Sequence, residues 1–230
     1  MSNNKINLET DKQQGVWQNQ WQDVKSRRQK LLEDSSYRSH EHEVEMALSF
    51  VKDFDIFVDC GPGYAATESW SVADKIPNCE IIGIEAQEQC YILMKDLYPG
   101  TIYNKCISHK VGHVDGFTGS PTGKADFWLR ASDEYVETGA YKKCTIESTT
   151  IDILLRDKEG QALVWADIEG SEPDMLLGSL ESLKNNKIVG FFLETSPKTM
   201  YYLDKVLLPF GFKKQQYREC GTHADWLYYL

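Results

Sequence analysis

The stretch "FDIFVDCGPGYAA", residues 54–66, joins a short apolar run to a turn that contains two glycines. The apolar run is followed by an acid, Asp59, and then by Gly61 and Gly63. Glycine lets the backbone turn tightly and approach a ligand closely. A helix that begins near Thr67 would present its free N–H groups to this turn. The stretch predicts a strand, a turn and a helix; the turn suits a ligand, although a plain strand-to-helix turn also uses glycine.

Short apolar runs alternate with helical patterns along the rest of the chain. We expect further strands over 79–86, 100–108, 162–167 and 187–195, and helices over 40–52, 87–98, 171–186 and 197–208. Residues 212–230 read as an antiparallel hairpin. This order predicts an α/β fold with a doubly wound, mostly parallel sheet and a C-terminal hairpin. Ligands bind such sheets at the carboxyl ends of the strands, near the point where the strand order reverses.

Composition narrows the classes of partner and the location. The 230 residues carry a formal net charge of −10, which disfavours nucleic acid as a partner because like charges repel. No stretch resembles a membrane helix, and the polar N-terminus has no apolar signal core, so a cytoplasmic protein without a membrane span is expected. The six cysteines form no C-x-x-C pair, which argues against zinc.

Two regions of different character are expected. Residues 1–40 predict an N-terminal helical extension whose stripe contains Trp17 and Trp21, serving as a lid or a dimer contact. Residues 41–230 carry the strand and helix alternation. Oligomeric state is left open.

Glu85 ends the second expected strand, where an acid can accept hydrogen bonds from ribose hydroxyls. This role serves NAD or any adenosyl ligand. Gly61, Gly63 and Ala66 fit a loose G-x-G-x-x-A dinucleotide pattern. Asp59 would crowd a pyrophosphate but suits a ligand with an ammonium group, and the hairpin is foreign to a six-stranded dinucleotide fold. NAD therefore stays an alternative rather than the first choice.

The stretch "WADIEGSEPDMLLGS", residues 165–179, places Asp167 and Glu169 at the mouth of another apolar strand. Either acid can act as a general base for a hydroxyl, or both can bind a divalent cation such as Mg²⁺ together with Glu194. Glu169 can instead cap the next helix, whose N-terminus favours carboxylates.

Asp59, Gly61, Gly63 and Glu85 together resemble the acid-x-Gly-x-Gly turn and the following acid of the class I S-adenosylmethionine methyltransferases. Residues 165–179 are similar to the Asp-x-Glu-Gly-x-Glu-x-x-x-Leu-x-Gly signature of the FkbM-type members. Two departures stand out: Trp165 occupies a position where a lysine is common, and His109 one where Asp or Asn is common. The resemblance runs from about residue 40 to the C-terminus and implies a seven-stranded sheet.

The resemblance and the places of these residues at strand ends and in neighbouring loops together give a full set of expected site residues. The cofactor would be held by Asp59, Gly61, Gly63, Tyr64, Glu85, Ala86, Cys106, Ile107, Ser108 and Asp167. Catalysis would fall to Asp167, Glu169 and His109, and a cation would be held by Asp167, Glu169 and Glu194.

The expected activity is S-adenosylmethionine-dependent O-methylation of a hydroxyl on a sugar or other small metabolite, by in-line transfer with carboxylate or cation assistance. A glycan or small-molecule acceptor is the expected partner. The alternatives are an NAD-linked oxidoreductase and a non-catalytic protein that binds an adenosyl ligand on the same fold.

Overall fold

The computed structural model describes residues 41–63, 65–119, 126–128, 141–221 and 223–230. They lie within the unit Ser39–Leu230. The helical extension expected over 1–40 lies outside the described residues, so its role as a lid or dimer contact stays a prediction. Across the described ranges, no helix is both long enough and apolar enough to cross a membrane.

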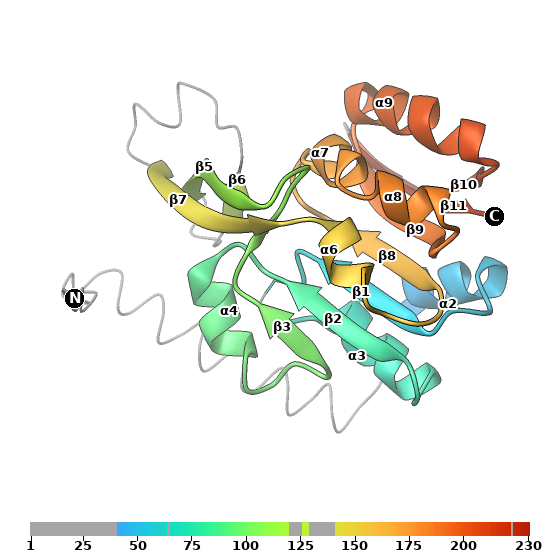
Figure 1. Cartoon of the computed structure of the whole chain (residues 1–230), viewed down its shortest axis with the longest axis horizontal. Helices are drawn as coiled ribbons and strands as arrows, with labels where there is room; N and C mark the ends of the chain where they lie inside the picture. The colour runs from blue at the N-terminus through green and yellow to red at the C-terminus, as the bar shows by residue number, and fades with distance from the viewer. Residues whose placement is uncertain (1–40, 64, 120–125, 129–140, 222) are drawn as a thin grey trace. The chain divides into compact units, whose positions relative to one another are not determined.

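A seven-stranded sheet forms the middle layer of the fold (Figure 1). Its strands are β1 (Ile56–Cys60), β2 (Glu80–Ile84), β3 (Thr101–Tyr103), β8 (Ala162–Ala166), β9 (Ile188–Thr195), β10 (Lys213–Cys220) and β11 (His223–Tyr229). The spatial order is β10-β11-β9-β8-β1-β2-β3. Strands β1, β2, β3, β8 and β9 are parallel, whereas β11 runs antiparallel to both of its neighbours. The expected mostly parallel sheet and C-terminal hairpin are confirmed.

The centre of the sheet is where the strand order reverses. The chain builds outward from β1 to β2 and β3, then returns to place β8 and β9 on the other side of β1. Every residue of β1 and β8 is buried, because parallel strands covered on both faces need continuous apolar runs. The carboxyl ends of β1 and β8 therefore form the crevice in which a doubly wound sheet holds its ligand.

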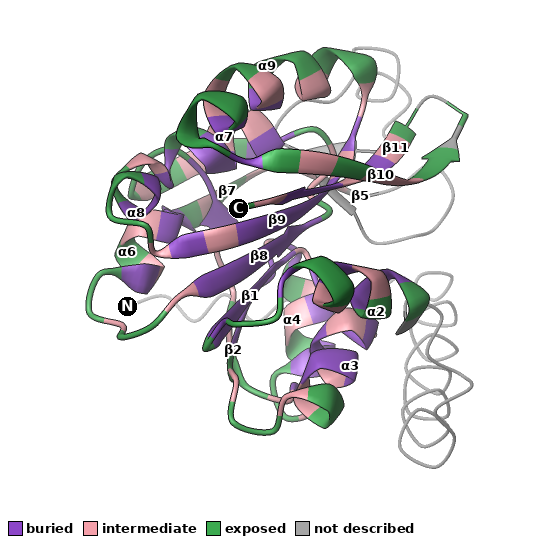
Figure 2. Ribbon diagram, turned by 90° about the vertical axis from the view of Figure 1, so that its right-hand side faces the viewer, coloured by how far each residue is buried: buried purple, intermediate pink, exposed green. Residues whose placement is uncertain are grey.

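Helices cover both faces of this sheet (Figure 2). One face carries α2 (Glu41–Phe50), α3 (Thr67–Lys75) and α4 (Glu88–Met94). The other carries α6 (Ile151–Leu155), α7 (Glu172–Leu177), α8 (Leu180–Lys184) and α9 (Pro197–Leu207). Helix α9 begins where expected because the Ser196 hydroxyl accepts a hydrogen bond from the Thr199 amide at 3.2 Å and Pro197 occupies the first turn.

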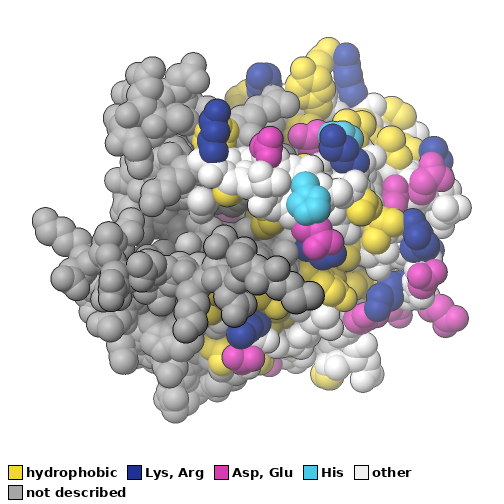
Figure 3. All heavy atoms as spheres, turned by 60° about the vertical axis from the view of Figure 1, so that its left-hand side comes forward, with side chains coloured by type: hydrophobic (Ala, Val, Ile, Leu, Met, Phe, Trp, Pro, Cys, Tyr) yellow, Lys and Arg dark blue, Asp and Glu magenta, His cyan; other side chains and the backbone are white. Residues whose placement is uncertain are grey.

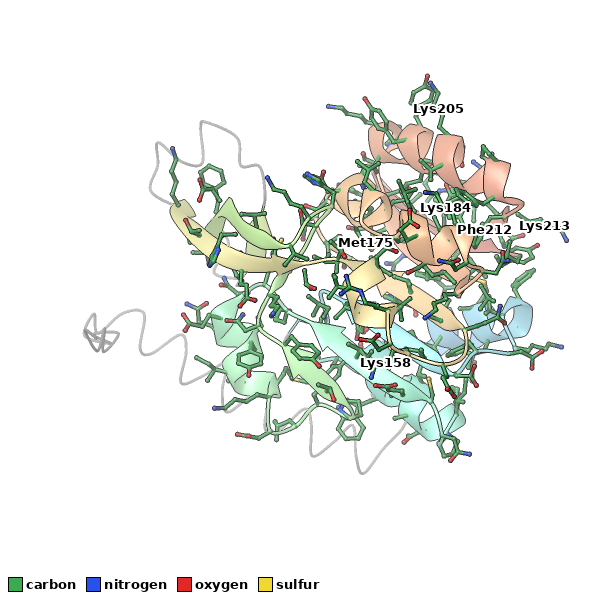
Figure 4. The ribbon with its side chains drawn as sticks, viewed as in Figure 1. Lys158, Met175, Lys184, Lys205, Phe212 and Lys213 are labelled. Atoms are coloured by element: carbon green, nitrogen blue, oxygen red, sulfur yellow. The ribbon has the colours of Figure 1, made fainter. Side chains whose placement is uncertain are left out.

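Two apolar cores lie on opposite faces of the sheet. On the α6–α9 face, Met175 and Phe212 are nearly inaccessible and pack with the strands; both are labelled in Figure 4. On the α2–α4 face, Trp165 stacks on Phe192 with ring centroids 3.8 Å apart, beside Phe57. Trp165, which stands where the FkbM-type pattern commonly has a lysine, thus packs in this second aromatic core.

The third expected strand, 100–108, is in fact two strands in two sheets. Strand β3 ends at Tyr103, and Asn104 turns its side chain to the Glu85 carbonyl at 2.9 Å. The chain then enters a separate four-stranded sheet of order β4-β7-β5-β6. These strands are β4 (Cys106–Ile107), β5 (Gly112–Gly119), β6 (Asp126–Trp128) and β7 (Tyr141–Thr149). The expectation of one strand was wrong because β4 pairs with the distant β7 rather than with β2.

The single helix expected over 171–186 is also divided, into α7 and α8. Gly178 is the C-cap residue of α7. It lies directly against the carbonyl oxygen of Ser108, just after β4, and a side chain there would overlap that oxygen. The Ser179 hydroxyl then donates to the Leu176 carbonyl at 2.8 Å. Asp152 accepts the amides of Glu181 and Ser182 at 3.1 and 2.7 Å, which gives α8 its own start.

Candidate functional site

The glycine turn after β1 is fastened to both neighbouring strands. The Gly61 amide donates to the Ile84 carbonyl at 2.9 Å, and the Asp167 amide donates to the Cys60 carbonyl at 3.2 Å. Gly61 has a φ of +86° and lies so close to the Asp167 carbonyl oxygen that no β-carbon fits between them. Glycine is therefore required here for its conformation and for the close approach of two chain segments.

Glu85 joins this turn to the end of β2. Its two carboxylate oxygens accept hydrogen bonds from the Gly63 amide at 3.0 Å and the Gln87 amide at 2.7 Å. Gly63 has a φ of +60°, and a β-carbon added there would meet no described atom within 4 Å. Glu85 thereby holds the glycine turn against the end of β2. Ala86 follows directly and is half-buried.

Asp59 lies beneath the turn rather than at its surface. It is 1 % exposed, and it accepts a hydrogen bond from the Ser69 hydroxyl of α3. Ser69 in turn is 2.7 Å from the Tyr98 hydroxyl. Burial, and next the charge of Glu68, raise the pKa of Asp59 well above its usual range. The network ties the end of β1 to α3 and to the segment that follows α4. No sequence pattern pointed to Ser69 or Tyr98.

Several carboxylates lie on the same face of the sheet, because the side chains along a strand alternate between its two faces. Side chains of a strand point to opposite faces in turn. Phe57, Leu163 and Phe192 pack in the core on the α2–α4 face, so the acids an even number of residues further along are on that same face. These acids are Asp59, Asp167 and Glu194, joined by Asp225, which pairs with Glu194 across β9 and β11.

Asp167 and Glu194 form a hydrogen-bonded carboxyl pair. The Asp167 carboxyl reaches solvent, yet protein atoms crowd the space around it. This desolvation, and next the charge of Glu194, raise its pKa to about 7. Desolvation also raises the pKa of Glu194. A carboxyl whose pKa is raised to about 7, such as that of Asp167, can take a proton from a hydroxyl and later release it to water.

The loop after Asp167 is held from below by Glu172. Glu169 has a φ of +56°, a left-handed conformation that is uncommon outside glycine, and Gly170 follows at +86°. One oxygen of Glu172 accepts the amides of Ile168 and Gly170, both at 3.3 Å. Glu172 is only 1 % exposed, and burial raises its pKa to about 7. The second glutamate of the signature thus fixes the loop, a role that its spacing alone did not predict.

Ser171 is the N-cap residue of α7, but its side chain makes no capping hydrogen bond. Asp174, in the first turn of α7, faces His109. The His109 Nδ1 atom is 3.3 Å from Asp174 Oδ1, and both side chains are partly exposed. His109 is therefore paired with α7 at the junction with the second sheet.

Cys106, Ile107 and Ser108 are buried at the start of that second sheet. The Ser108 amide donates to the Thr149 carbonyl at 2.9 Å, and its carbonyl oxygen abuts Gly178. Burial raises the pKa of the Cys106 thiol to about 12, so it is not a nucleophile at neutral pH. Tyr64 lies outside the described residues.

The expected divalent cation is not supported. Among the described residues, no three or more His, Cys, Asp or Glu side chains are arranged to hold a metal ion. Asp167 and Glu194 are bonded to each other instead. Among the coloured side chains of the face shown in Figure 3, acidic and basic ones are interspersed.

One ion-pair cluster was missed from the sequence. Arg218 of β10 is 3.0 Å from Asp225 and 3.8 Å from the buried Glu43 of α2. Arg218 and Asp225 are cross-strand partners in the C-terminal hairpin, and Glu43 joins them from a distant part of the chain.

Solved structures with a related fold include several methyltransferases. The human methyltransferase 10 domain containing protein has a TM-score of 0.46 and 10% identity, covering 83% of this chain and 79% of that one. Precorrin-6y C5,15-methyltransferase from Geobacter metallireducens GS-15 has a TM-score of 0.46 and 9% identity, covering 83% and 88%. The plantazolicin methyltransferase in complex with SAH has a TM-score of 0.43 and 10% identity, covering 93% and 98%.

No protein-family model matches the sequence, and no curated protein matches it significantly. At these identities and TM-scores the structural likenesses assign neither a family nor an activity. We therefore base the function on the geometry of the site.

Proposed function

We propose that this chain is an S-adenosylmethionine-dependent methyltransferase that methylates a hydroxyl oxygen. One observation carries the proposal: the Glu85 carboxylate is bonded to the Gly63 amide at the reversal point of the sheet. This hydrogen bond joins an acid that suits ribose hydroxyls to a turn that lets the backbone approach a ligand closely. A β-carbon added at Gly63 would meet no described atom within 4 Å, which leaves room for a ligand there.

The charge of the site fits this cofactor. Asp167 and Glu194 lie at the ends of adjacent parallel strands, and their mutual repulsion contributes to the raised pKa of Asp167. A ligand that brings positive charge relieves such repulsion. S-adenosylmethionine carries a sulfonium and an ammonium group, whereas the phosphates of NAD are negative. The antiparallel β11 also departs from the parallel strands of a dinucleotide-binding sheet.

The residues can be given roles. Gly61 and Gly63 offer backbone to the cofactor, Glu85 accepts the ribose hydroxyls, and Ala86 borders them. In the same proposal Cys106, Ile107 and Ser108 flank the adenine, and Tyr64 lies along the turn. Asp59 acts indirectly, because it is buried beneath the turn and bonded to Ser69.

Bound S-adenosylmethionine supplies a methyl group on sulfur that leaves a neutral thioether behind when it is displaced. The acceptor hydroxyl must lose its proton as its oxygen forms the new bond. We assign that proton to Asp167, beside Glu194, because its pKa is raised to about 7, near the pH at which a general base works best. Glu169, on the strained loop beside Asp167, orients the acceptor, and His109 is a second candidate for moving the proton.

The acceptor is proposed to be a sugar or another small hydroxylated metabolite, in keeping with the resemblance of residues 165–179 to the FkbM-type signature. The proposal does not include a metal.

Calorimetric titration with S-adenosylhomocysteine and with NAD tests the cofactor. We expect the first to bind and Glu85→Ala to weaken it by ~10–150-fold, since a hydrogen bond to a charged group contributes about 1.5–3 kcal/mol. Circular dichroism melting of each variant checks that the turn still folds. Binding of NAD alone would refute the proposal.

Asp167→Asn tests the base. The amide keeps the size of the side chain but cannot take the proton, so turnover should fall ~10²–10⁴-fold while S-adenosylhomocysteine binds nearly as before. An equal loss of binding and turnover would make Asp167 a cofactor-binding residue instead. Unchanged turnover would contradict the assignment.

A further inference from the structure

The second sheet contacts the candidate site through the short segment 85–87. Near the end of β5, the half-buried Thr118 donates a hydrogen bond from its hydroxyl to the side-chain oxygen Oε1 of Gln87 at 2.7 Å. Gln87 is the N-cap residue of α4 and is only 5 % exposed. A hydrogen bond to such a buried side chain is shielded from water, which strengthens it. The contact therefore fixes β5 beside the strand end that carries Glu85.

The chain is fixed to the same segment where it enters the second sheet. Asn104 lies between β3 and β4, and its side-chain Nδ2 donates to the Glu85 carbonyl at 2.9 Å and to the Ala86 carbonyl at 3.4 Å. Asn104 and Thr118 thus both bond to one segment of three residues at the carboxyl end of β2. The second sheet is held directly beside Glu85 by side chains from two of its parts.

The main chain of Gln87 connects this contact with the Glu85 carboxylate. The Gln87 amide donates to Glu85 Oε1 at 2.7 Å, and Glu85 Oε2 accepts the Gly63 amide at 3.0 Å. One chain of hydrogen-bonded residues therefore runs from β5 to the glycine turn. Because the carboxylate is held at both oxygens, a displacement of Gln87 changes the position of Glu85 relative to the turn.

We propose that Thr118 and Gln87 are positioning residues that couple the docking of the second sheet to cofactor binding at Glu85. The inference rests on the proposed function, in which Glu85 accepts the ribose hydroxyls of the cofactor. Neither residue is assigned a contact with the cofactor, since both act by holding the Glu85 carboxylate in place. Coupling between two sites is reciprocal, so a bound cofactor stabilises the Thr118–Gln87 contact by the same factor by which that contact strengthens binding.

Calorimetric titration of the full chain with S-adenosylhomocysteine measures the coupling. Thr118→Val replaces the hydroxyl by a methyl group of similar size and should weaken binding ~2–10-fold, as expected for one neutral hydrogen bond. Thr118→Ser keeps the hydroxyl and should restore the affinity of the parent. Thr145→Val is the matched control, because the Thr145 hydroxyl lies on the same sheet and donates at the same 2.7 Å, but to the exposed Asp115. A loss in Thr145→Val equal to that in Thr118→Val would count against the inference.

A double-mutant cycle tests whether Thr118 acts through Glu85. In the Glu85→Ala background, Thr118→Val should leave the affinity for S-adenosylhomocysteine unchanged, since the group through which it acts is absent. Losses that multiply in the double variant would show that Thr118 acts independently of Glu85, and would overturn the inference.

Amide hydrogen exchange tests the contact without any cofactor. In ligand-free Thr118→Val, the amides of Gly63 and Gln87 should exchange faster, because Glu85 accepts both. The amide of Val164 in the buried strand β8 should exchange as it does in the parent. Equal acceleration at Val164 would indicate a general loosening of the fold and would refute the coupling.

Failure of this inference differs from failure of the proposed function. S-adenosylhomocysteine that binds the parent and Thr118→Val equally well overturns the coupling alone. No binding of S-adenosylhomocysteine to the parent overturns the proposed function and the coupling with it.

Discussion

Replacing Gly61 by alanine isolates the cost of the close approach between the glycine turn and Asp167. Gly61 and Gly63 both have positive φ, at +86° and +60°, but only Gly61 has a backbone oxygen where its β-carbon would be. Alanine at a positive φ costs about 1–2 kcal/mol. Loss of glycine's freedom in the unfolded chain returns about 0.4–1 kcal/mol. Gly63→Ala should therefore lower the free energy of unfolding by only ~0–2 kcal/mol.

Gly61→Ala adds an overlap with a backbone atom that cannot rotate away. Overpacking of this kind costs about 1–3 kcal/mol. Because the two variants share the conformational terms, their difference reports the overlap alone. We expect Gly61→Ala to be less stable than Gly63→Ala by ~1–3 kcal/mol, which corresponds to a melting temperature lower by ~2–12 °C for a chain of this size.

Urea unfolding followed by circular dichroism, with both variants measured beside the parent, gives the comparison. Binding should show the opposite order, because a methyl group at Gly63 projects into the space beside Glu85. Equal stability of the two variants would refute the claim that the turn and Asp167 touch. A destabilised Gly63→Ala with an unaffected Gly61→Ala would refute it more strongly.

Two further predictions concern Glu172 and Trp165. Burial raises the pKa of Glu172 to about 7, so the stability contributed by its protonated form is present below its unfolded pKa of ~4.3 and is lost as the pH rises through 7. Glu172→Gln should be more stable than the parent at pH 8 by up to about 3 kcal/mol, whereas near pH 4 the two proteins should have the same free energy of unfolding. Urea unfolding at both pH values checks this. The same dependence of that free energy on pH in both proteins would contradict it. Trp165→Ala removes the ring stacked on Phe192 and should cost ~3–5 kcal/mol in the same assay, whereas a loss below ~1 kcal/mol would mean that the aromatic core does not depend on it.

The sequence predicted the main sheet because its central strands are buried on both faces. Strands buried on both faces need continuous apolar runs, such as residues 162–166, and these runs can be recognised in the sequence. The starts of α3 and α9 followed from local signals. The acids at the strand ends could be named in advance, since alternation and parallel pairing bring them to one edge of the sheet.

The second sheet and the break between α7 and α8 could not be predicted from local patterns. Strand β4 is two residues long and exists only through its pairing with β7. The sequence around Gly178 does not reveal its contact with the Ser108 carbonyl oxygen, because Ser108 lies far away in the chain. His109 likewise gained its partner, Asp174 on α7, from a contact between distant segments. Such contacts leave no periodic mark in the sequence.

The second sheet leaves and rejoins the main fold at almost the same point. Ile107, near its start, pairs with Thr149 at its end, and the Ser108 amide bonds to the Thr149 carbonyl. Main-sheet pairing involves none of β4, β5, β6 or β7. A segment whose two ends are neighbours can be exchanged or shortened without repositioning the strands on either side. Changes in β5, β6 and β7 can therefore remodel this side of the fold while the pairing of the seven-stranded sheet stays constant.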